Sequence, residues 1–164
     1  MKPSLLLCFL TLLSGSGFGQ NRAINKALAD SPRAYALFDS VGKPAQWNTL
    51  VEAAANADVV LFGEYHDDPI MHWLQTELVR DLISTGVQPV LGAEMLEADD
   101  QLVVNEFLAG LMSKEKLKAA ANLWPNHFTD YHPLLEIAKE NGLPFVATNV
   151  PRRYASYVYQ NGLS

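Results

Sequence analysis

The sequence predicts an α/β fold built on a mainly parallel sheet, with helices packed on both of its faces. Three short apolar runs rich in Val, Leu and Ala have the pattern of strands buried on both faces: residues 58–64, 89–95 and 144–150. Helical patterns separate these runs, and strands that alternate with helices form parallel sheets through right-handed crossovers. We therefore expect the three runs to be parallel strands.

Turn and capping residues support these boundaries. Each run follows residues that favour turns, namely Asn56 to Asp58, Gly86 with Pro89, and Asn141 and Gly142 with Pro144. Asp68 is a good N-cap and Pro69 fits the first helical position. The helix that follows has an apolar stripe and should end near Gly86; the stripe consists of Ile70, Trp73, Leu74, Leu78 and Leu82. His72 lies off this stripe, which favours a solvated position.

The remaining helical patterns follow the same logic. Upstream, residues 35–47 predict a strand, a glycine-containing turn and the entry to a helix. Further helices are expected over residues 49–55, 98–111, 114–123, 134–141 and 152–160.

Residues 1–19 have the features of a cleaved secretory signal peptide. A basic residue at the start precedes an apolar stretch, and Gly17 and Gly19 have the small-residue spacing that signal peptidase recognises. The stretch is shorter than the roughly 20 residues that span a bilayer. Cys8, the only cysteine, lies inside this stretch, so lipid attachment is the less favoured interpretation. We expect a protein secreted across the inner membrane, periplasmic or associated with the outer membrane.

Charge and length limit the class of protein. The formal net charge is −6, and it becomes −7 without the leader, which contains Lys2 and no other charged residue. A negative chain is a poor partner for nucleic acid or an anionic membrane surface. The composition is that of a globular protein, and the roughly 145 remaining residues predict a single domain, residues 20–164.

Polar residues stand at the end of each predicted strand. They are Glu64 and His66 after the first strand, Glu94 at the second, and Asn149 with Arg152 and Arg153 after the third. Ligands of open α/β sheets bind beyond the carboxyl ends of the strands. We therefore expect these groups to converge on one edge of the sheet.

Two interpretations of the first group stay open. A carboxylate after five apolar residues is costly to bury alone, so Glu64 either pairs with an arginine structurally or belongs to a site. His66 stands two residues after Glu64, which lets both point into one cleft and favours a role in a site.

An aromatic and imidazole cluster precedes the helix at 134–141. It contains Trp124, His127, Phe128, Tyr131 and His132. These side chains would form either a lid over an apolar pocket or a cluster on the surface that binds nothing. The sequence has no helical His pair of zinc-site spacing, no glycine-rich phosphate loop and no Gly-x-Ser-x-Gly elbow.

Three segments taken together resemble the ChaN-like haem-binding proteins. In order and spacing these are "VVLFGEYHDDPIMHWLQTELVRDL", "VLGAEMLEADDQLVVNEFLAG" and "LWPNHFTDYHPLLEIAKENGLPFVATNVPRRYAS". The superfamily also includes Tiki-type and TraB-type proteins and, more distantly, erythromycin esterases. The resemblance runs from about Tyr35 to the last residue, and its specificity comes from the combination Gly-Glu-x-His-Asp, Glu-Met and Asn-x-Pro-Arg.

The resemblance implies a secreted or outer-membrane-associated bacterial protein that takes part in haem and iron uptake. It implies haem in a pocket shared between the subunits of a homodimer, and outer-membrane haem-uptake components as partners. Members of the family are often lipoproteins. They are also longer, so we expect residues 20–164 to be an N-terminal fragment of a ChaN-like domain.

Two functions compete. A haem binder needs an apolar slot, a Tyr or His toward the iron, and polar or cationic groups for the propionates; the candidates are His66, Tyr131, His132, Asn149, Arg152, Arg153 and Tyr154. A metal-dependent hydrolase would instead hold a divalent ion, and similarity to Tiki proteins implies Glu64, His66 and Glu94 as its ligands. Haem binding is the first hypothesis because the fuller match lies with that branch.

Overall fold

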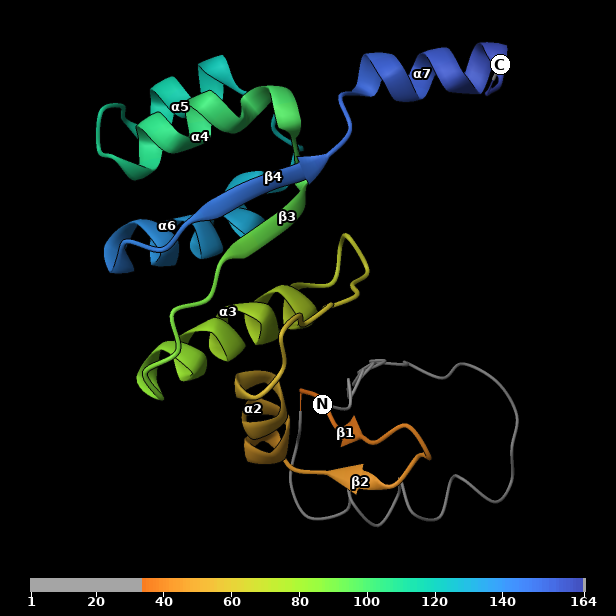
Figure 1. The fold of residues 1–164 in the computed structure, drawn as a ribbon, viewed down its shortest axis with the longest axis vertical. Helices are drawn as coiled ribbons and strands as arrows, with labels where there is room; N and C mark the ends of the chain where they lie inside the picture. The colour runs from red at the N-terminus through yellow and green to blue at the C-terminus, as the bar shows by residue number, and fades with distance from the viewer. Residues whose placement is uncertain (1–33, 164) are drawn as a thin grey trace. The chain divides into compact units, whose positions relative to one another are not determined.

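The computed structural model describes residues 34–163, which fall into two compact units (Figure 1). Unit 1 ends at Val87 and unit 2 begins at Gln88, and each is described by itself. The predicted signal peptide, residues 1–19, lies outside the described residues. None of the described helices is both long and apolar enough to span a bilayer.

Unit 1 begins with a small antiparallel hairpin. Strand β1, Leu37–Phe38, pairs with β2, Pro44–Ala45. The Asp39 side chain accepts two backbone N–H bonds from the turn, and Gly42 has a φ of 78°, a left-handed conformation that glycine adopts without strain. The predicted strand, turn and helix entry are therefore confirmed.

Two helices form the core of unit 1. Helix α2 spans Trp47–Ala55 and α3 spans Pro69–Ser84. Their contact buries Val51, Ala54, Leu78 and Leu82. The Trp47 indole Nε1 donates to the Asp81 carboxylate at 2.6 Å and so joins the two helices.

Helix α3 begins where the sequence predicts. The Asp68 carboxylate accepts from the backbone N–H groups of Ile70 and Met71 at 2.9 and 3.2 Å, and Pro69 is the first helical residue. These bonds satisfy two of the N–H groups that every helix start leaves without an intrahelical partner.

The prediction of a strand over residues 58–64 is wrong. These residues form no strand, and Val59 and Leu61 are 70% and 67% exposed. An apolar run is held extended in a sheet only when a neighbouring strand accepts and donates its backbone hydrogen bonds. Within the described residues this run has no such ladder.

Unit 2 contains the parallel pair that the sequence predicts. Strand β3, Leu91–Glu97, lies parallel to β4, Phe145–Asn149. The amide of Gln101 bonds the outer edge of β4: it donates to the Phe145 carbonyl at 2.9 Å and accepts from the Ala147 N–H at 2.7 Å. A side chain thus takes the place of a further strand at this edge.

The helices of unit 2 match the predicted segments within a few residues. They are η1 (Ala98–Asp100), α4 (Gln101–Leu108), α5 (Lys114–Ala120), the π-helical turn η2 (His127–Tyr131), α6 (His132–Asn141) and α7 (Arg152–Asn161). Helix α6 ends at Gly142, whose φ of 64° ends the helix in the left-handed conformation before β4.

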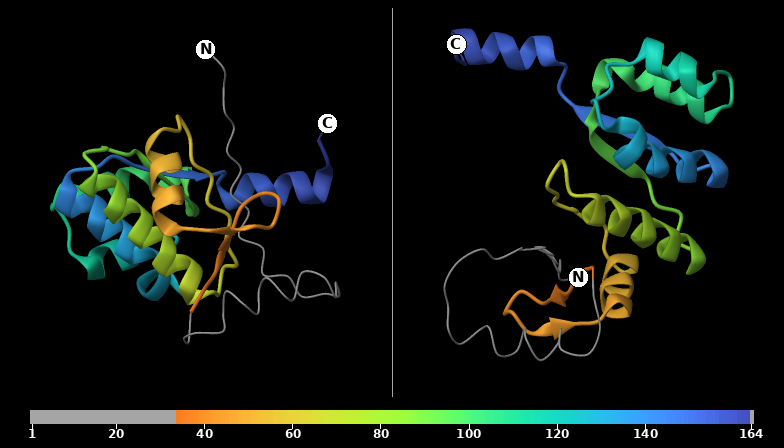
Figure 2. Two further views of the ribbon diagram at one scale, coloured as in Figure 1. Left: turned by 90° about the horizontal axis from the view of Figure 1, so that it is seen from below. Right: turned by 180° about the vertical axis from the view of Figure 1, so that it is seen from behind.

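One face of the β3–β4 sheet is covered (Figures 1 and 2). Its inward residues are buried: Ala93, Met95, Phe145 and Ala147. The alternate residues are exposed: Gly92, Glu94, Val146 and Thr148. The sequence predicts helices on both faces, whereas the helices of unit 2 cover one. The α/β class with a parallel sheet is confirmed.

Candidate functional site

In unit 1, the largely buried carboxylate of Glu64 contacts several polar side chains. Glu64 leaves only 10% of its side chain exposed, and one of its oxygens accepts from Gln75 Nε2 at 2.6 Å. Its other oxygen lies 3.2 Å from Nδ1 of His66, a side chain that is 58% exposed. Glu64 and His66, which the sequence predicts to share a cleft, are therefore in contact, and their role in a site stays a prediction.

The same carboxylate contacts an imidazole that the sequence placed in solvent. His72 is 2% exposed, and its Nε2 lies 3.4 Å from Glu64 Oε2. The prediction of a solvated His72 is wrong because the buried side of α3 is wider than its apolar stripe and also contains polar residues, among them His72 and Gln75. The signal available in the sequence was the three-residue spacing of His72 and Gln75, which brings both onto one side of the helix.

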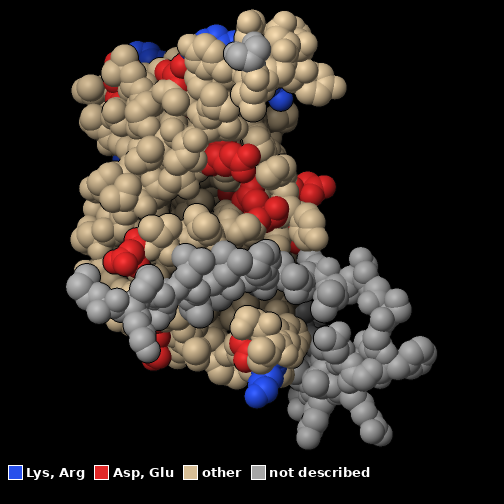
Figure 3. All heavy atoms as spheres, turned by 45° about the vertical axis from the view of Figure 1, so that its right-hand side comes forward, with Lys and Arg blue, Asp and Glu red and all other residues tan. Residues whose placement is uncertain are grey.

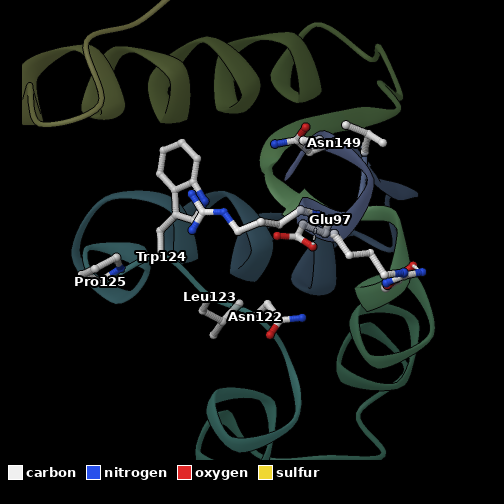
Figure 4. A pocket seen from close by; sticks show the side chains of 11 residues that line it. Glu97, Asn122, Leu123, Trp124, Pro125 and Asn149 are labelled. Carbon is white, nitrogen blue, oxygen red and sulfur yellow. Dashed lines mark hydrogen bonds and ion pairs between the residues drawn. The ribbon is translucent and has the colours of Figure 1, made fainter. Parts of the chain in front are cut away.

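A pocket lies beyond the carboxyl ends of β3 and β4 in unit 2 (Figure 4). Its volume is about 600 Å³, within the range of small-molecule sites. Figure 4 shows Trp124 and Pro125 to one side, Asn149 to another, and the Glu97 carboxylate between them. The lining residues are Glu97, Asp99, Asn122, Leu123, Trp124, Pro125, Asn149, Val150, Arg152, Arg153 and Ala155.

The carboxylate at the end of β3 is Glu97. The sequence placed the end of this strand near Glu94, but the strand continues to Glu97, which stands opposite Asn149 after an irregularity in the register. Glu94 is an exposed residue in the middle of the strand. Glu97 follows Glu94 by three residues, at the boundary between β3 and the next helix, and this position was its signal in the sequence.

Asp100 holds one wall of the pocket in place. It is 3% exposed, and both carboxylate oxygens lie 3.2 Å from the Asn122 backbone N–H. Burial raises the pKa of Asp100, while the hydrogen bond from Asn122 opposes that rise. This contact fixes the segment that carries Leu123 and Trp124, and it joins residues 22 positions apart, which no local sequence pattern predicts.

The start of α7 brings two arginines to the pocket. The backbone N–H of Arg152 donates to Glu97 Oε2 at 2.9 Å. Arg153 forms a two-bonded ion pair with Asp99 and lies 4.5 Å from the centre of the Tyr154 ring. The hydrogen bond from Arg153 lowers the pKa of Asp99, and the same contact raises the pKa of Arg153.

Tyr131 and His132, two predicted haem ligands, are both 3% exposed, and neither lines the pocket. The Tyr131 ring packs edge to face against Trp124, with their centres 5.9 Å apart. Tyr154, the third candidate in unit 2, is 54% exposed on α7, and it is not among the lining residues of the pocket, although its neighbours Arg153 and Ala155 are.

His132 belongs to a buried chain of polar groups. Its Nε2 lies 2.9 Å from Glu136 Oε1, and its Nδ1 lies 3.3 Å from Nε2 of His127, which is 1% exposed. Burial, with the nearby His132 and Lys114, lowers the pKa of His127 to about 4. Burial also lowers the pKa of His132.

The predicted metal ligands Glu64, His66 and Glu94 come from both units, so their common cluster stays a prediction. Within residues 34–163, no three His, Cys, Asp or Glu side chains are grouped so that they could hold a metal ion. Acidic and basic side chains are both visible on the face shown in Figure 3, and the formal net charge of the whole chain is −6.

Comparisons with known proteins identify relatives. A sequence profile described as haem-binding uptake, Tiki superfamily, ChaN matches residues 50–164. The chain is 29% identical over 133 residues to Protein RETICULATA-RELATED 5, chloroplastic, of Arabidopsis thaliana, a match that covers 76% of this chain and 18% of that protein.

A solved structure has a similar fold. It is described as cofacial heme binding to ChaN of Campylobacter jejuni; the TM-score is 0.63 at 18% identity, over 76% of this chain and 51% of that one. The chain thus spans about half of that structure. Since the family profile matches most of its length, the chain belongs to the haem-binding uptake family of the Tiki superfamily that includes ChaN.

Proposed function

We propose that this chain binds haem in the unit 2 pocket and takes part in haem and iron uptake. The observation that carries the proposal is that an aromatic residue, Trp124 (Figure 4), and a cationic residue, Arg152, line one pocket. An aromatic wall offers a flat surface to a planar macrocycle, and a cation offers charge-assisted hydrogen bonds to its carboxylate side chains. Membership of the ChaN family supports the proposal.

The lining residues fit the chemistry of haem. Leu123, Trp124 and Val150 supply apolar and aromatic surface for the macrocycle, and Arg152 supplies a cation for a propionate. The side-chain amide of Asn149 can donate to the same carboxylate. Haem itself would supply an iron centre that can take a ligand from the protein.

Tyr154 is the proposed iron ligand from unit 2. Its side chain is accessible, whereas Tyr131 and His132 are buried, and both ring nitrogens of His132 already face other side chains. His66, which lies in unit 1, stays a predicted haem ligand. The Arg153 Nη2 donates to the Tyr154 hydroxyl at 3.4 Å.

Location and partners are also part of the proposal. The features of residues 1–19 support secretion to the periplasm or the outer membrane. The family resemblance supports a homodimer and outer-membrane haem-uptake components as partners.

The alternative proposal, a metal-dependent hydrolase, rests on the segment Gly63 to His66. The contact between Glu64 and His66 supports it, because a carboxylate and an imidazole are common ligands of a catalytic divalent ion. Metal-dependent hydrolysis of peptides or esters by the purified protein, lost in His66→Ala, would favour this alternative.

A haemin titration tests the first proposal. We expect a saturable Soret band with micromolar or tighter affinity for the mature protein, and weaker binding in Trp124→Ala. Trp73→Ala, which removes an exposed indole from unit 1, is the matched control. Tyr154→Phe should alter the iron spectrum. Non-saturable association of haemin would refute the proposal.

A further inference from the structure

The pocket of unit 2 has as many negative as positive side chains, but its two arginines are not equally available to a ligand. Its charged lining residues are Glu97, Asp99, Arg152 and Arg153, which gives two negative and two positive side chains. A ligand that carries carboxylates therefore meets no excess of positive charge. What matters is which arginine is already engaged.

Arg153 is engaged by the protein. Both terminal nitrogens of its guanidinium contact the Asp99 carboxylate, and the group also lies over the Tyr154 ring. A two-bonded arginine–carboxylate pair satisfies the donors that a ligand carboxylate would otherwise use. Recruiting Arg153 to a ligand would require breaking this pair.

Arg152 is held differently. Glu97 accepts a hydrogen bond from the backbone N–H of Arg152. This contact fixes the main chain at Arg152 and does not involve its guanidinium. Among the residues that the structure describes, no side chain hydrogen-bonds to or forms an ion pair with the Arg152 guanidinium, which lies at the pocket wall. The Glu97 carboxylate remains in the pocket as a negative charge that repels further anions.

We infer that the pocket binds one carboxylate of its ligand through Arg152, and that Asp99 and Glu97 prevent the binding of a second. This inference rests on the proposed haem function and specifies how haem is oriented. One propionate lies against Arg152, and the other stays in solvent. Asp99 and Glu97 are thereby specificity-determining residues, since they set how many ligand carboxylates the pocket accepts.

Partly esterified haemins test the inference directly. For the mature protein we expect haemin and haemin monomethyl ester to bind within about threefold of each other, because one free carboxylate suffices. Haemin dimethyl ester should bind about tenfold more weakly, which corresponds to about 1.4 kcal/mol. Quenching of tryptophan fluorescence and the Soret band provide two independent readouts.

Variants separate the two arginines. Arg152→Gln should weaken haemin binding about tenfold and leave dimethyl ester binding unchanged. Asp99→Asn should free Arg153, so that haemin binds several times more tightly than its monomethyl ester. Glu97→Gln, whose amide oxygen still accepts the Arg152 N–H, should tighten haemin binding but not dimethyl ester binding. Arg80→Gln, which alters an exposed arginine of unit 1, is the matched control.

The outcomes distinguish this inference from the proposed function. Equal losses from the first and second esterification would overturn it, because they would mean that both carboxylates are held. Arg152→Gln that weakens haemin and dimethyl ester alike would also overturn it, since that would indicate a structural role. In either case saturable haemin binding would still support the proposed function. Absence of saturable haemin binding by the unaltered protein would overturn both.

Discussion

Protonation of His127 should make the stability of the protein depend on pH in a defined interval. The imidazole is buried, and its pKa falls from 6.5 to about 4 because burial and the nearby His132 and Lys114 disfavour the cation. The unfolded chain therefore takes up this proton below about pH 6.5, whereas the folded protein takes it up only near pH 4. Stability from this group is present above pH 6.5 and is lost as the pH falls toward 4.

The magnitude follows from the two pKa values. Each unit by which they differ is worth about 1.4 kcal/mol, so the whole interval amounts to about 3 kcal/mol. That is a large fraction of the 5–15 kcal/mol that typically separates a folded domain from its unfolded state. Below pH 4 both states carry the proton, and the effect should level off.

His127→Gln isolates this contribution. We expect the difference in unfolding free energy between the unaltered protein and the variant to fall by about 3 kcal/mol from pH 7.5 to pH 4. Urea denaturation followed by far-ultraviolet circular dichroism at several pH values measures it. Taking the difference removes the titration of groups that both proteins share. A difference that is constant with pH, or that grows as the pH falls, would refute the reasoning.

The protonation state of the neighbouring imidazole supplies a second check. A carboxylate only accepts, so the contact between His132 Nε2 and Glu136 places the proton on that nitrogen. Nδ1 of His132 then accepts from Nε2 of His127. Nitrogen NMR at pH 7.5 should therefore show Nε2 protonated in both rings; a proton on Nδ1 of either ring would contradict the arrangement.

Three further predictions concern single contacts. Asp68→Ala should cost roughly 1 kcal/mol of unfolding free energy because α3 loses its cap, whereas Asp67→Ala should change little; equal losses in urea denaturation would count against the capping role. Gln101→Leu should remove both bonds to the edge of β4 and speed amide hydrogen exchange at Ala147, and unchanged exchange would show that the edge is held otherwise. Glu64→Gln should leave the melting temperature nearly unchanged while weakening binding of a divalent metal or haem about tenfold; destabilisation with normal binding would make the contact structural.

Local features of this fold are determined by the sequence alone. Asp68 and Pro69 start α3 because a cap bonds N–H groups two and three residues away, so the whole interaction is contained in a few neighbouring residues. Asn149 and Arg152 reach the pocket because they directly follow a strand whose direction the alternation of strands and helices predicts. The resemblance to ChaN proteins, carried by motifs in order, also required no structure.

The tertiary structure decided which residues these local patterns bring together. The run at 58–64 has the composition of a buried strand, but a strand forms only against another backbone, and composition does not supply that partner. His72 lies outside the apolar stripe of α3, but the loop that carries Glu64 packs against this side of the helix and buries the imidazole. Glu97, rather than Glu94, is the carboxylate of the pocket because the length of β3 depends on its register with β4, where Glu97 stands opposite Asn149, 52 residues further along the chain. Burial and register are properties of contacts between distant segments, and no short stretch of sequence contains them.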